Sequence, residues 1–307
     1  MRVFIDGQAG TTGLHIEQRL ARLPDFSLLT IDPAQRKDPQ AKLAMFAQAD
    51  VVILCLHDDD ARASVAQIEA LQGQGQTAPR VIDASTAHRT APGWVYGFAE
   101  LTPGQAQAIA QAGWVSNPGC YATGAIALLR PLIDAGLLPA DSAVCLPSVS
   151  GYTGGGRAMI EAYESGQAAP HEMYALALEH KHVPEIMHWS GLKHRPLFTP
   201  SVGNFAQGML VQLPLHLDAL AQGTRAAHVE QALRAHYAGS TWVQVHTQPD
   251  GHKLQADALA GDDHMRLWVG AADRHGHCLL VAQLDNLGKG ASGAAVQNLQ
   301  LMAGGAG

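Results

Sequence analysis

The chain has little charge and no long apolar run. Asp, Glu, Lys and Arg make up 15% of its 307 residues, against about 25% in an average soluble protein. Apolar residues make up 47%, which excludes a disordered chain, since such chains are poor in apolar residues and rich in charge. No apolar run reaches the roughly 18 residues of a membrane helix, and residues 1–7 lack the apolar core of a signal peptide. We therefore expect a globular, cytoplasmic protein that does not associate with membranes.

Basic blocks and paired cysteines are also missing. The net charge is −7, whereas nucleic-acid-binding domains usually carry a basic patch, so nucleic acid is not an expected partner. Only four cysteines are present, which favours a reducing compartment over a disulfide framework. Cys55, Cys145 and Cys278 lie inside apolar runs, as small core residues do. Cys120 has different surroundings.

The first 115 or so residues alternate short apolar runs with amphipathic stretches, a pattern typical of a parallel sheet covered by helices. The predicted strands are Arg2–Ile5, Leu28–Ile31, Val51–Leu56, Arg80–Asp83 and Trp114–Ser116. The predicted helices are Gly13–Leu23, Ala61–Leu71 and Pro103–Ala112, the last with Thr102 as its N-cap.

From Asn117 onward the pattern changes. Longer β-rich runs follow one another, at Met209–Leu215, Trp242–Val245, Arg266–Ala271 and Leu279–Leu284. Such a succession favours a mixed or antiparallel sheet over a second nucleotide-binding unit. An Ala- and Gln-rich stretch, Ala291–Met302, predicts a final helix.

A glycine-rich turn, Gly7-Gln-Ala-Gly10-Thr11-Thr12-Gly13, directly follows the first predicted strand and opens the first helix. Glycines there let the backbone turn sharply and approach a pyrophosphate, whose charge a helix N-terminus favours. The spacing differs from the usual Gly-x-Gly-x-x-Gly. A purely structural strand-to-helix turn is therefore the alternative.

The end of the second predicted strand carries conflicting indications about the cofactor. Asp32 stands where an acidic residue often binds the ribose hydroxyls of NAD. Arg36 and Lys37 follow within five residues, well placed to pair with the 2′-phosphate of NADP. A solvated loop is the alternative for these two cations.

Cys120 lies in the most informative stretch, Ser116-Asn-Pro-Gly-Cys120-Tyr-Ala-Thr-Gly124. Pro118 and Gly119 end the preceding strand, and a helix is predicted from about Tyr121 to Ala135. Cys120 is thereby placed at a helix N-terminus, where unpaired amides and the helix dipole stabilise a thiolate and lower its pKa. We expect a nucleophile, with an inert buried thiol as the alternative.

Two further stretches can complete a site. His180 and His182 would share a face if their segment is extended, and either imidazole can transfer protons near neutral pH. A metal site is the rival interpretation, but the chain lacks Cys-x-x-Cys and His-Glu-x-x-His, so no metal is predicted. Ser150, Gly151 and Arg157 border a glycine-rich loop that can offer amides and one guanidinium to an anion, unless it is a flexible hairpin.

These motifs, in order along nearly the whole chain, resemble the N-acetyl-γ-glutamyl-phosphate reductase family of arginine biosynthesis, and its short form most of all. Besides the stretches above, the resemblance rests on Asp83–Arg89, Val95–Glu100, His180–Glu185, Phe198–Gly208 and Asp285–Gly290. The wider relatives are aspartate-semialdehyde dehydrogenase and phosphorylating glyceraldehyde-phosphate dehydrogenase. One departure from them is Gly119, which stands before the cysteine in place of Asn.

The resemblance implies a Rossmann-type domain over residues 1–117, completed by a C-terminal helix within 287–307, and an α+β catalytic domain over 118–286. It implies an oxidoreductase that uses NADP(H), an acyl phosphate substrate, release of phosphate and a homo-oligomer. Cys120 would form a thioester, and either His180 or His182 would be the acid/base group. Ser85 and Asn286 would join the cofactor site, and Ser150, Gly151 and Arg157 would contact substrate.

Three alternatives remain open from the sequence. A sibling enzyme would reduce aspartyl phosphate or an aminoadipyl derivative. A nucleotide-sensing regulator would keep the fold without turnover, although it would have no need of Cys120 and the two histidines. A Cys–His hydrolase would leave the Gly7–Gly13 turn unexplained.

Overall fold

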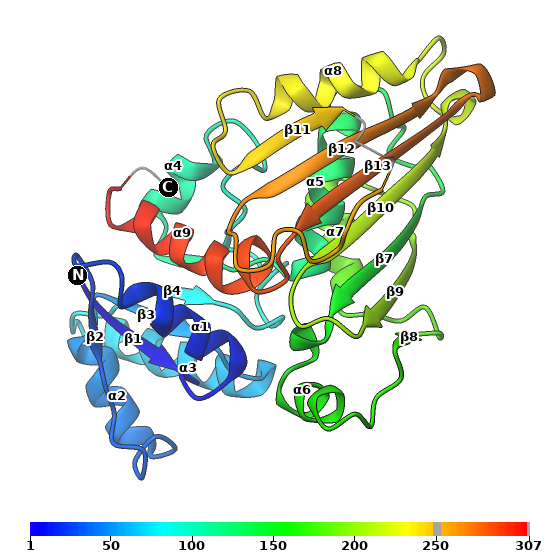
Figure 1. Ribbon diagram of the computed structural model, residues 1–307. Coiled ribbons are helices and arrows are strands. Elements are labelled where there is room, and N and C mark those ends of the chain that lie inside the picture. The colour runs from blue at the N-terminus through cyan, green and yellow to red at the C-terminus, as the bar shows by residue number, and fades with distance from the viewer. Residues whose placement is uncertain (248–252, 306–307) are drawn as a thin grey trace. The chain divides into compact units, whose positions relative to one another are not determined.

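The computed structural model describes residues 1–247 and 253–305, so the last two residues of the expected C-terminal segment lie outside it. The chain divides into two compact units (Figure 1). The first unit comprises residues 1–99, 103–118 and 291–307, and the second comprises residues 100–102 and 119–290.

The first unit is built on a six-stranded, wholly parallel sheet with the order β2-β1-β3-β4-β6-β5. Val51–Leu54 shows why these segments are strands: all four residues are apolar and buried, as in a sheet covered on both faces. The strands are β1 (Arg2–Asp6), β2 (Ser27–Leu29), β3 (Val51–Leu54), β4 (Arg80–Asp83), β5 (Val95–Tyr96) and β6 (Trp114–Ser116).

Helices cover both faces of this sheet. One apolar cluster joins the strands to α1 (Thr11–Leu20), α4 (Gln105–Gln111) and α9 (Gly293–Met302), through residues such as Ile16, Ile109 and Leu299. The other joins them to α2 (Pro39–Gln48) and α3 (Asp58–Gly73), through Phe46 and Ile68. The predicted Rossmann-type fold is confirmed, and its strand order reverses between β1 and β3, where such sheets bind their ligands.

The C-terminal helix α9 belongs to the first unit through buried polar contacts as well as apolar packing. Asn298 Nδ2 donates to the carbonyl of Gly97 at 3.0 Å and to Asn117 Oδ1 at 3.1 Å. Asn117 in turn donates to the carbonyl of Ala291 at 2.9 Å. These hydrogen bonds connect α9 to the residue that follows β6.

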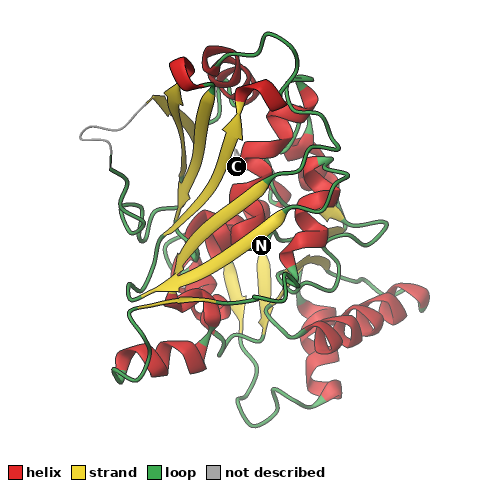
Figure 2. Cartoon of the chain, turned by 90° about the vertical axis from the view of Figure 1, so that its right-hand side faces the viewer, coloured by secondary structure: helices red, strands yellow, loops and turns green. Residues whose placement is uncertain are grey.

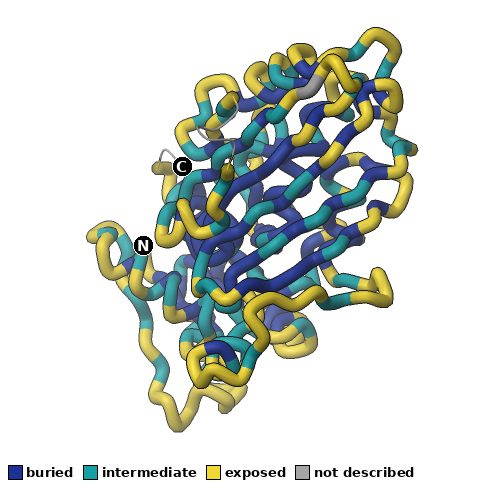
Figure 3. The backbone as a smooth tube through the Cα atoms, turned by 45° about the vertical axis from the view of Figure 1, so that its right-hand side comes forward, coloured by how far each residue is buried: buried dark blue, intermediate teal, exposed yellow. Residues whose placement is uncertain are grey.

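The second unit holds a seven-stranded sheet with the order β11-β12-β13-β10-β7-β9-β8. The sheet is mixed, which agrees with the mixed or antiparallel sheet that the sequence predicts. Along β10 buried and more exposed residues alternate, because one face of the sheet packs on helices (Figure 3). Its strands are β7 (Cys145–Gly151), β8 (His171–Met173), β9 (Leu197–Gly203), β10 (Met209–His216), β11 (Val243–Thr247), β12 (Met265–Ala272) and β13 (His277–Leu284).

Helix α5 (Cys120–Asp134) is the core helix of this unit and has eleven buried residues. It packs on β10 and β13 and lies between α7 (His182–Ser190) and α8 (Ala226–His236). The remaining helix, α6 (Arg157–Glu164), follows the glycine-rich loop (Figure 1). Figure 2 shows how helices and strands are combined in the chain.

The local structure differs from the expectations of the sequence in three ways. The helix expected from Pro103 begins at Gln105, with Gly104 at φ +84° as its N-cap in place of Thr102. Helix α2 and strand β5 were not expected. The histidine segment is not extended, because His182 is the first residue of α7.

Candidate active site

The turn between β1 and α1 can be built only from glycine at two of its positions. Gly7 has φ +90°, and a side chain there would overlap the carbonyl oxygen of Cys55. A Cβ at Gly13 would lie 2.7 Å from the carbonyl oxygen of Gly7. Gly10 is the N-cap of α1, with no side-chain cap and no acidic residue in the first turn. The backbone is therefore open to an anion at the helix N-terminus, which fits a pyrophosphate.

Asp32 lies in the loop after β2 and not at the end of the strand, where the sequence predicted it. The strand ends at Leu29, so Asp32 lies three residues beyond it, and its Oδ1 accepts the amide of Ala34 at 2.9 Å. Arg36 and Lys37 are exposed. The Asp32 carboxylate is thereby engaged by its own loop.

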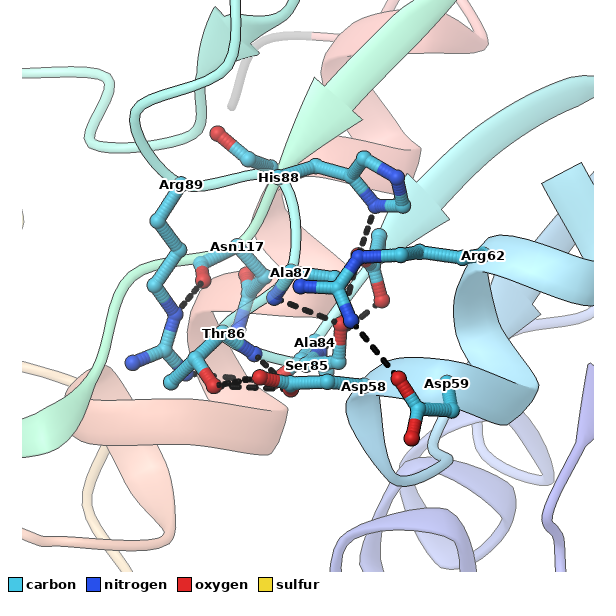
Figure 4. A network of polar contacts seen from close by, with 12 residues as sticks. Asp58, Asp59, Arg62, Ala84, Ser85, Thr86, Ala87, His88, Arg89 and Asn117 are labelled. Atoms are coloured by element: carbon cyan, nitrogen blue, oxygen red, sulfur yellow. Dashed lines mark hydrogen bonds and ion pairs between the residues drawn. The ribbon is translucent and has the colours of Figure 1, made fainter. Parts of the chain in front are cut away.

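Ser85 helps to shape the loop after β4 (Figure 4). The fully buried Asp83 carboxylate accepts the Ser85 amide at 2.9 Å, the Ser85 hydroxyl at 2.7 Å and His88 Nδ1 at 2.6 Å. The Ser85 oxygen also accepts the amide of Ala87 at 3.1 Å. Ser85 therefore uses its side chain and its amide inside the loop.

The same loop supports the strand that leads to the cysteine. Arg89, which is 8% exposed, donates to the carbonyls of Asn117 and Ala84, each at 3.1 Å. Thr86 is bound to Asp58 through both its amide and its hydroxyl. The end of β6 is thus fixed three residues before Cys120.

In the second unit Cys120 is the first residue of α5, with Gly119 as N-cap, and is partly exposed. The other thiols are less suited to attack a substrate. Burial raises the pKa of Cys55 to about 12 and that of Cys278 to about 11. Cys145 is the first residue of β7, whereas the predicted substrate residue Ser150 lies near the other end of that strand. At the usual rise per residue the two are about 16 Å apart, so Cys145 is far from the predicted substrate site.

Glu185 is a site residue that the sequence analysis missed, although it ends a motif that carries the resemblance. It is 1% exposed on α7, and its Oε1 accepts the amide of Gly119 at 2.8 Å. The peptide that precedes Cys120 is therefore held by a buried carboxylate. The spacing from His182 to Glu185, three residues on one helix face, was the available indication.

Removing this acceptor is expected to destabilise the protein. Glu185→Ala leaves the buried Gly119 amide without its partner, which costs about 1–3 kcal/mol. Glu185→Gln keeps an acceptor oxygen and should cost clearly less. Urea denaturation of both variants measures the difference, and equal losses would contradict this role of Glu185.

The two histidines meet although their segment is not extended. Their ring centroids are 4.8 Å apart, and His180 also contacts the rings of Tyr121, Tyr174 and Phe198 at 6.1, 5.9 and 5.0 Å. The backbone amide of His182 donates to His180 Nδ1 at 3.1 Å. In the neutral ring the proton is therefore on Nε2, which becomes the hydrogen-bond donor. His180 is partly exposed, whereas His182 is 5% exposed.

Two tyrosines next to His180 were also missed. The Tyr121 hydroxyl donates to the carbonyl of Ser201 at 2.8 Å, and the rings of both tyrosines contact His180. Burial raises the pKa of Tyr174 to about 12, and it also raises the pKa of Tyr121. Both hydroxyls therefore stay protonated beside Cys120 at neutral pH.

The glycine-rich loop is a short 3₁₀ turn, Tyr152–Gly155, and not a hairpin. Ser150 is buried and donates to the carbonyl of Gly151 at 3.1 Å, and the Gly151 amide donates to Gly208 at 2.9 Å. Asn286 accepts the amide of Gly208 at 2.9 Å and donates to Thr153 Oγ1 at 2.9 Å. The residues predicted to bind substrate and cofactor thus brace this loop.

Arg157 is exposed at the first position of α6.

Within residues 1–247 and 253–305, no three His, Cys, Asp or Glu side chains are grouped so that they could hold a metal ion. None of the described helices combines the length and apolar character that a membrane span requires.

The chain is similar in sequence to enzymes of one activity. It is 51% identical over 308 residues to N-acetyl-gamma-glutamyl-phosphate reductase 2 of Pseudomonas putida, covering 98% of this chain and 96% of that protein. It is 50% identical to N-acetyl-gamma-glutamyl-phosphate reductase of Brucella suis, covering 99% of each chain. The chain belongs to the N-acetyl-γ-glutamyl-phosphate reductase family. It is thus an oxidoreductase, and the resemblance found in the sequence is confirmed.

Residues 120–286 match the family model of the semialdehyde dehydrogenase dimerisation domain. Solved structures show the same fold at low identity. Aspartate semialdehyde dehydrogenase II of Vibrio cholerae, complexed with ASA, has a TM-score of 0.72 at 15% identity over 98% of each chain. Aspartate semialdehyde dehydrogenase with NADP from Candida albicans has a TM-score of 0.65 at 14% identity, again over 98% of each.

Proposed function

We propose that the chain reduces N-acetyl-γ-glutamyl phosphate to N-acetyl-glutamate semialdehyde and releases phosphate, with NADPH as reductant and Cys120 as nucleophile. The observation that carries the proposal is the position of Cys120, partly exposed at the start of α5 and next to the ring cluster around His180. Relatives about 50% identical over nearly the whole chain bear the name of this activity. The match to a dimerisation domain supports a homo-oligomer.

The first unit supplies the residues that would hold the dinucleotide. The amides of Thr11, Thr12 and Gly13 would bind the pyrophosphate at the start of α1. Gly7 allows the backbone to turn, and the predicted Gly10 contributes to the turn instead, because its amide donates to the carbonyl of Gly7 at 3.0 Å. Arg36 and Lys37 would pair with a 2′-phosphate. For Ser85 and Asn286 we propose an indirect role, because the side chains of both are hydrogen-bonded inside their own units.

In the first step the Cys120 sulfur bonds to the acyl carbon and the bond from that carbon to the phosphate oxygen breaks. The proton of the thiol ends on the released phosphate. Amides at the start of α5 and the Nε2–H of His180 would stabilise the oxyanion of the tetrahedral intermediate. For Arg157, with Ser150 and Gly151 in the loop before it, we propose contact with an anionic group of the substrate.

The cofactor, when bound, would supply the hydride that reduces the thioester carbon in the second step. His180 again donates to the oxygen, which carries negative charge until the carbon–sulfur bond breaks. The aldehyde leaves, and the Cys120 thiolate takes up a proton from solvent, which restores the thiol of the first step. A thioester suits this step because its carbonyl is electrophilic, unlike that of a carboxylate.

The reverse reaction tests the proposal. Purified protein with N-acetyl-glutamate semialdehyde, phosphate and NADP should form NADPH, and omission of phosphate should prevent it. Faster oxidation of aspartate semialdehyde or of the aminoadipate analogue would assign the chain to a sibling activity. Binding of NADPH without turnover of any of the three would indicate a sensor.

The enzyme is expected to prefer NADP(H), and Arg36 with Lys37 is expected to account for this. Charge-assisted contacts contribute about 1.5–3 kcal/mol each, which gives a roughly tenfold to hundredfold preference. The contact of Asp32 with the amide of Ala34 supports this assignment, since it engages the carboxylate that would repel a 2′-phosphate.

The measurement is kcat/KM with both cofactors, in the wild type and in the variant that combines Arg36→Ala and Lys37→Ala. The double variant should lose most of the preference while keeping its rate with NAD. A wild type that favours NAD would refute the preference, and a double variant that still discriminates would assign it to other residues.

A further inference from the structure

Lys289 is a buried cation that the proposed mechanism does not use. Its side chain is 2% exposed, and its Nζ lies 2.7 Å from Glu100 Oε2, a carboxylate that is itself 10% exposed. Nζ also lies 5.6 Å from the ring centroid of Trp242. Removing two charges from water is costly, and a well-packed apolar pair is often at least as stable. Stability alone is therefore a poor reason for this pair.

Lys289 belongs to a segment that packs on the proposed nucleophile. Residues Gly288–Ser292 form one π-helical turn, a rare conformation that is frequent at functional sites. The Gly290 amide donates to the carbonyl of Asp285 at 3.0 Å. A Cβ at Gly290 would lie 2.8 Å from the Cβ of Cys120 and 3.2 Å from its Cα, so the backbone of Gly290 lies directly against Cys120.

The opposite side of this turn is equally close to its neighbours. A Cβ at Gly288 would overlap the carbonyl oxygen of Asp262 and would lie 3.0 Å from Asp263 Oδ1. The turn thus passes between the Asp262–Asp263 segment and Cys120, and Lys289 anchors its middle to Glu100. A backbone so placed restricts the space around the Cβ of Cys120, and hence the staggered positions that its sulfur can adopt.

We propose that Lys289 is a positioning residue for Cys120. Its ion pair with Glu100 holds the Gly288–Ser292 turn against the Cβ of Cys120 and keeps the sulfur in the rotamer that faces substrate. The proposal rests on the role of Cys120 in the proposed function. It predicts that loss of the pair spreads the sulfur over its three staggered wells, so that the productive fraction falls to roughly one third or less.

The test compares Lys289→Met with the wild type in two measurements. The first is kcat and KM in the reverse reaction. The second is the rate of alkylation of Cys120 by iodoacetamide without substrate, followed by mass spectrometry. Both kcat and the alkylation rate should fall, by the same factor of about three or more, while KM stays unchanged. Glu100→Gln keeps a hydrogen-bond acceptor and should give a smaller loss in both.

Arg130→Met is the matched control, because it breaks the Arg130–Asp134 pair (2.7 Å) on the same helix, far from Cys120. It should leave both rates unchanged. The proposal is wrong if kcat falls in Lys289→Met and Glu100→Gln while the alkylation rate of Cys120 stays unchanged in both. It is also wrong if both variants have the kcat and the alkylation rate of the wild type. If the proposed activity is wrong, the wild type gives no turnover, but the alkylation rates still test the positioning of Cys120.

Discussion

Replacing Cys120 by serine is expected to lower turnover by at least about 10³-fold, a barrier increase of about 4 kcal/mol. The hydroxyl of serine is far less acidic than a thiol, so it would hardly ionise at neutral pH. An oxyester would also accept hydride more slowly than a thioester. The Cβ contact with Gly290 tolerates the change, since only the sulfur is replaced.

Cofactor binding provides the control for this variant. The dinucleotide site that we propose lies in the first unit and does not include Cys120, so Cys120→Ser should bind NADPH as the wild type does. Cys145→Ser, the same change in a strand of the same unit, should keep full activity. A Cys120→Ser enzyme with a tenth of the wild-type rate, a barrier change of only about 1.4 kcal/mol, would rule out the covalent mechanism.

His180→Asn is expected to lower kcat by about 10²–10³-fold, the usual effect of removing one donor to an oxyanion. The carboxamide of Asn reaches about as far as Nδ1 and can still accept the amide of His182. The Asn side chain has no hydrogen-bond donor at the position of His180 Nε2. The variant should therefore keep its stability and its KM while kcat falls.

His180→Gln makes this prediction specific to one nitrogen. The longer carboxamide can place an N–H near the position of Nε2, so it should recover part of the lost kcat. His182→Asn is the companion variant and should have the smaller effect on kcat, because His182 is buried at the start of α7. A larger loss of kcat in His182→Asn than in His180→Asn would exchange the roles of the two residues.

The parallel strands could be predicted because each is a short apolar run between turns. Arg80–Asp83 and Trp114–Ser116 have the expected bounds. Strand β5 has two residues, which is too short for a periodic pattern. Helix α2 is capped by Asp38 and has Pro39 in its first turn, but Phe46 is its one buried residue, so its sequence shows no continuous apolar face.

The sequence predicts those site residues whose role follows from their immediate neighbours in the chain. The Pro-Gly break before Cys120 places it at a helix start, and the structure has it there. The partners of that helix start come from distant parts of the chain. The bond between Gly119 and Glu185 spans 66 residues, and Lys289 pairs with a carboxylate 189 residues away. Only the tertiary fold brings such pairs together.

The most direct test of the covalent mechanism is a mixing experiment without reductant. Enzyme and N-acetyl-γ-glutamyl phosphate should release about one phosphate per chain in a rapid burst, and mass spectrometry should find the acyl group on Cys120. Release of no phosphate before NADPH is added, or an acyl group on Cys55, Cys145 or Cys278, would contradict it.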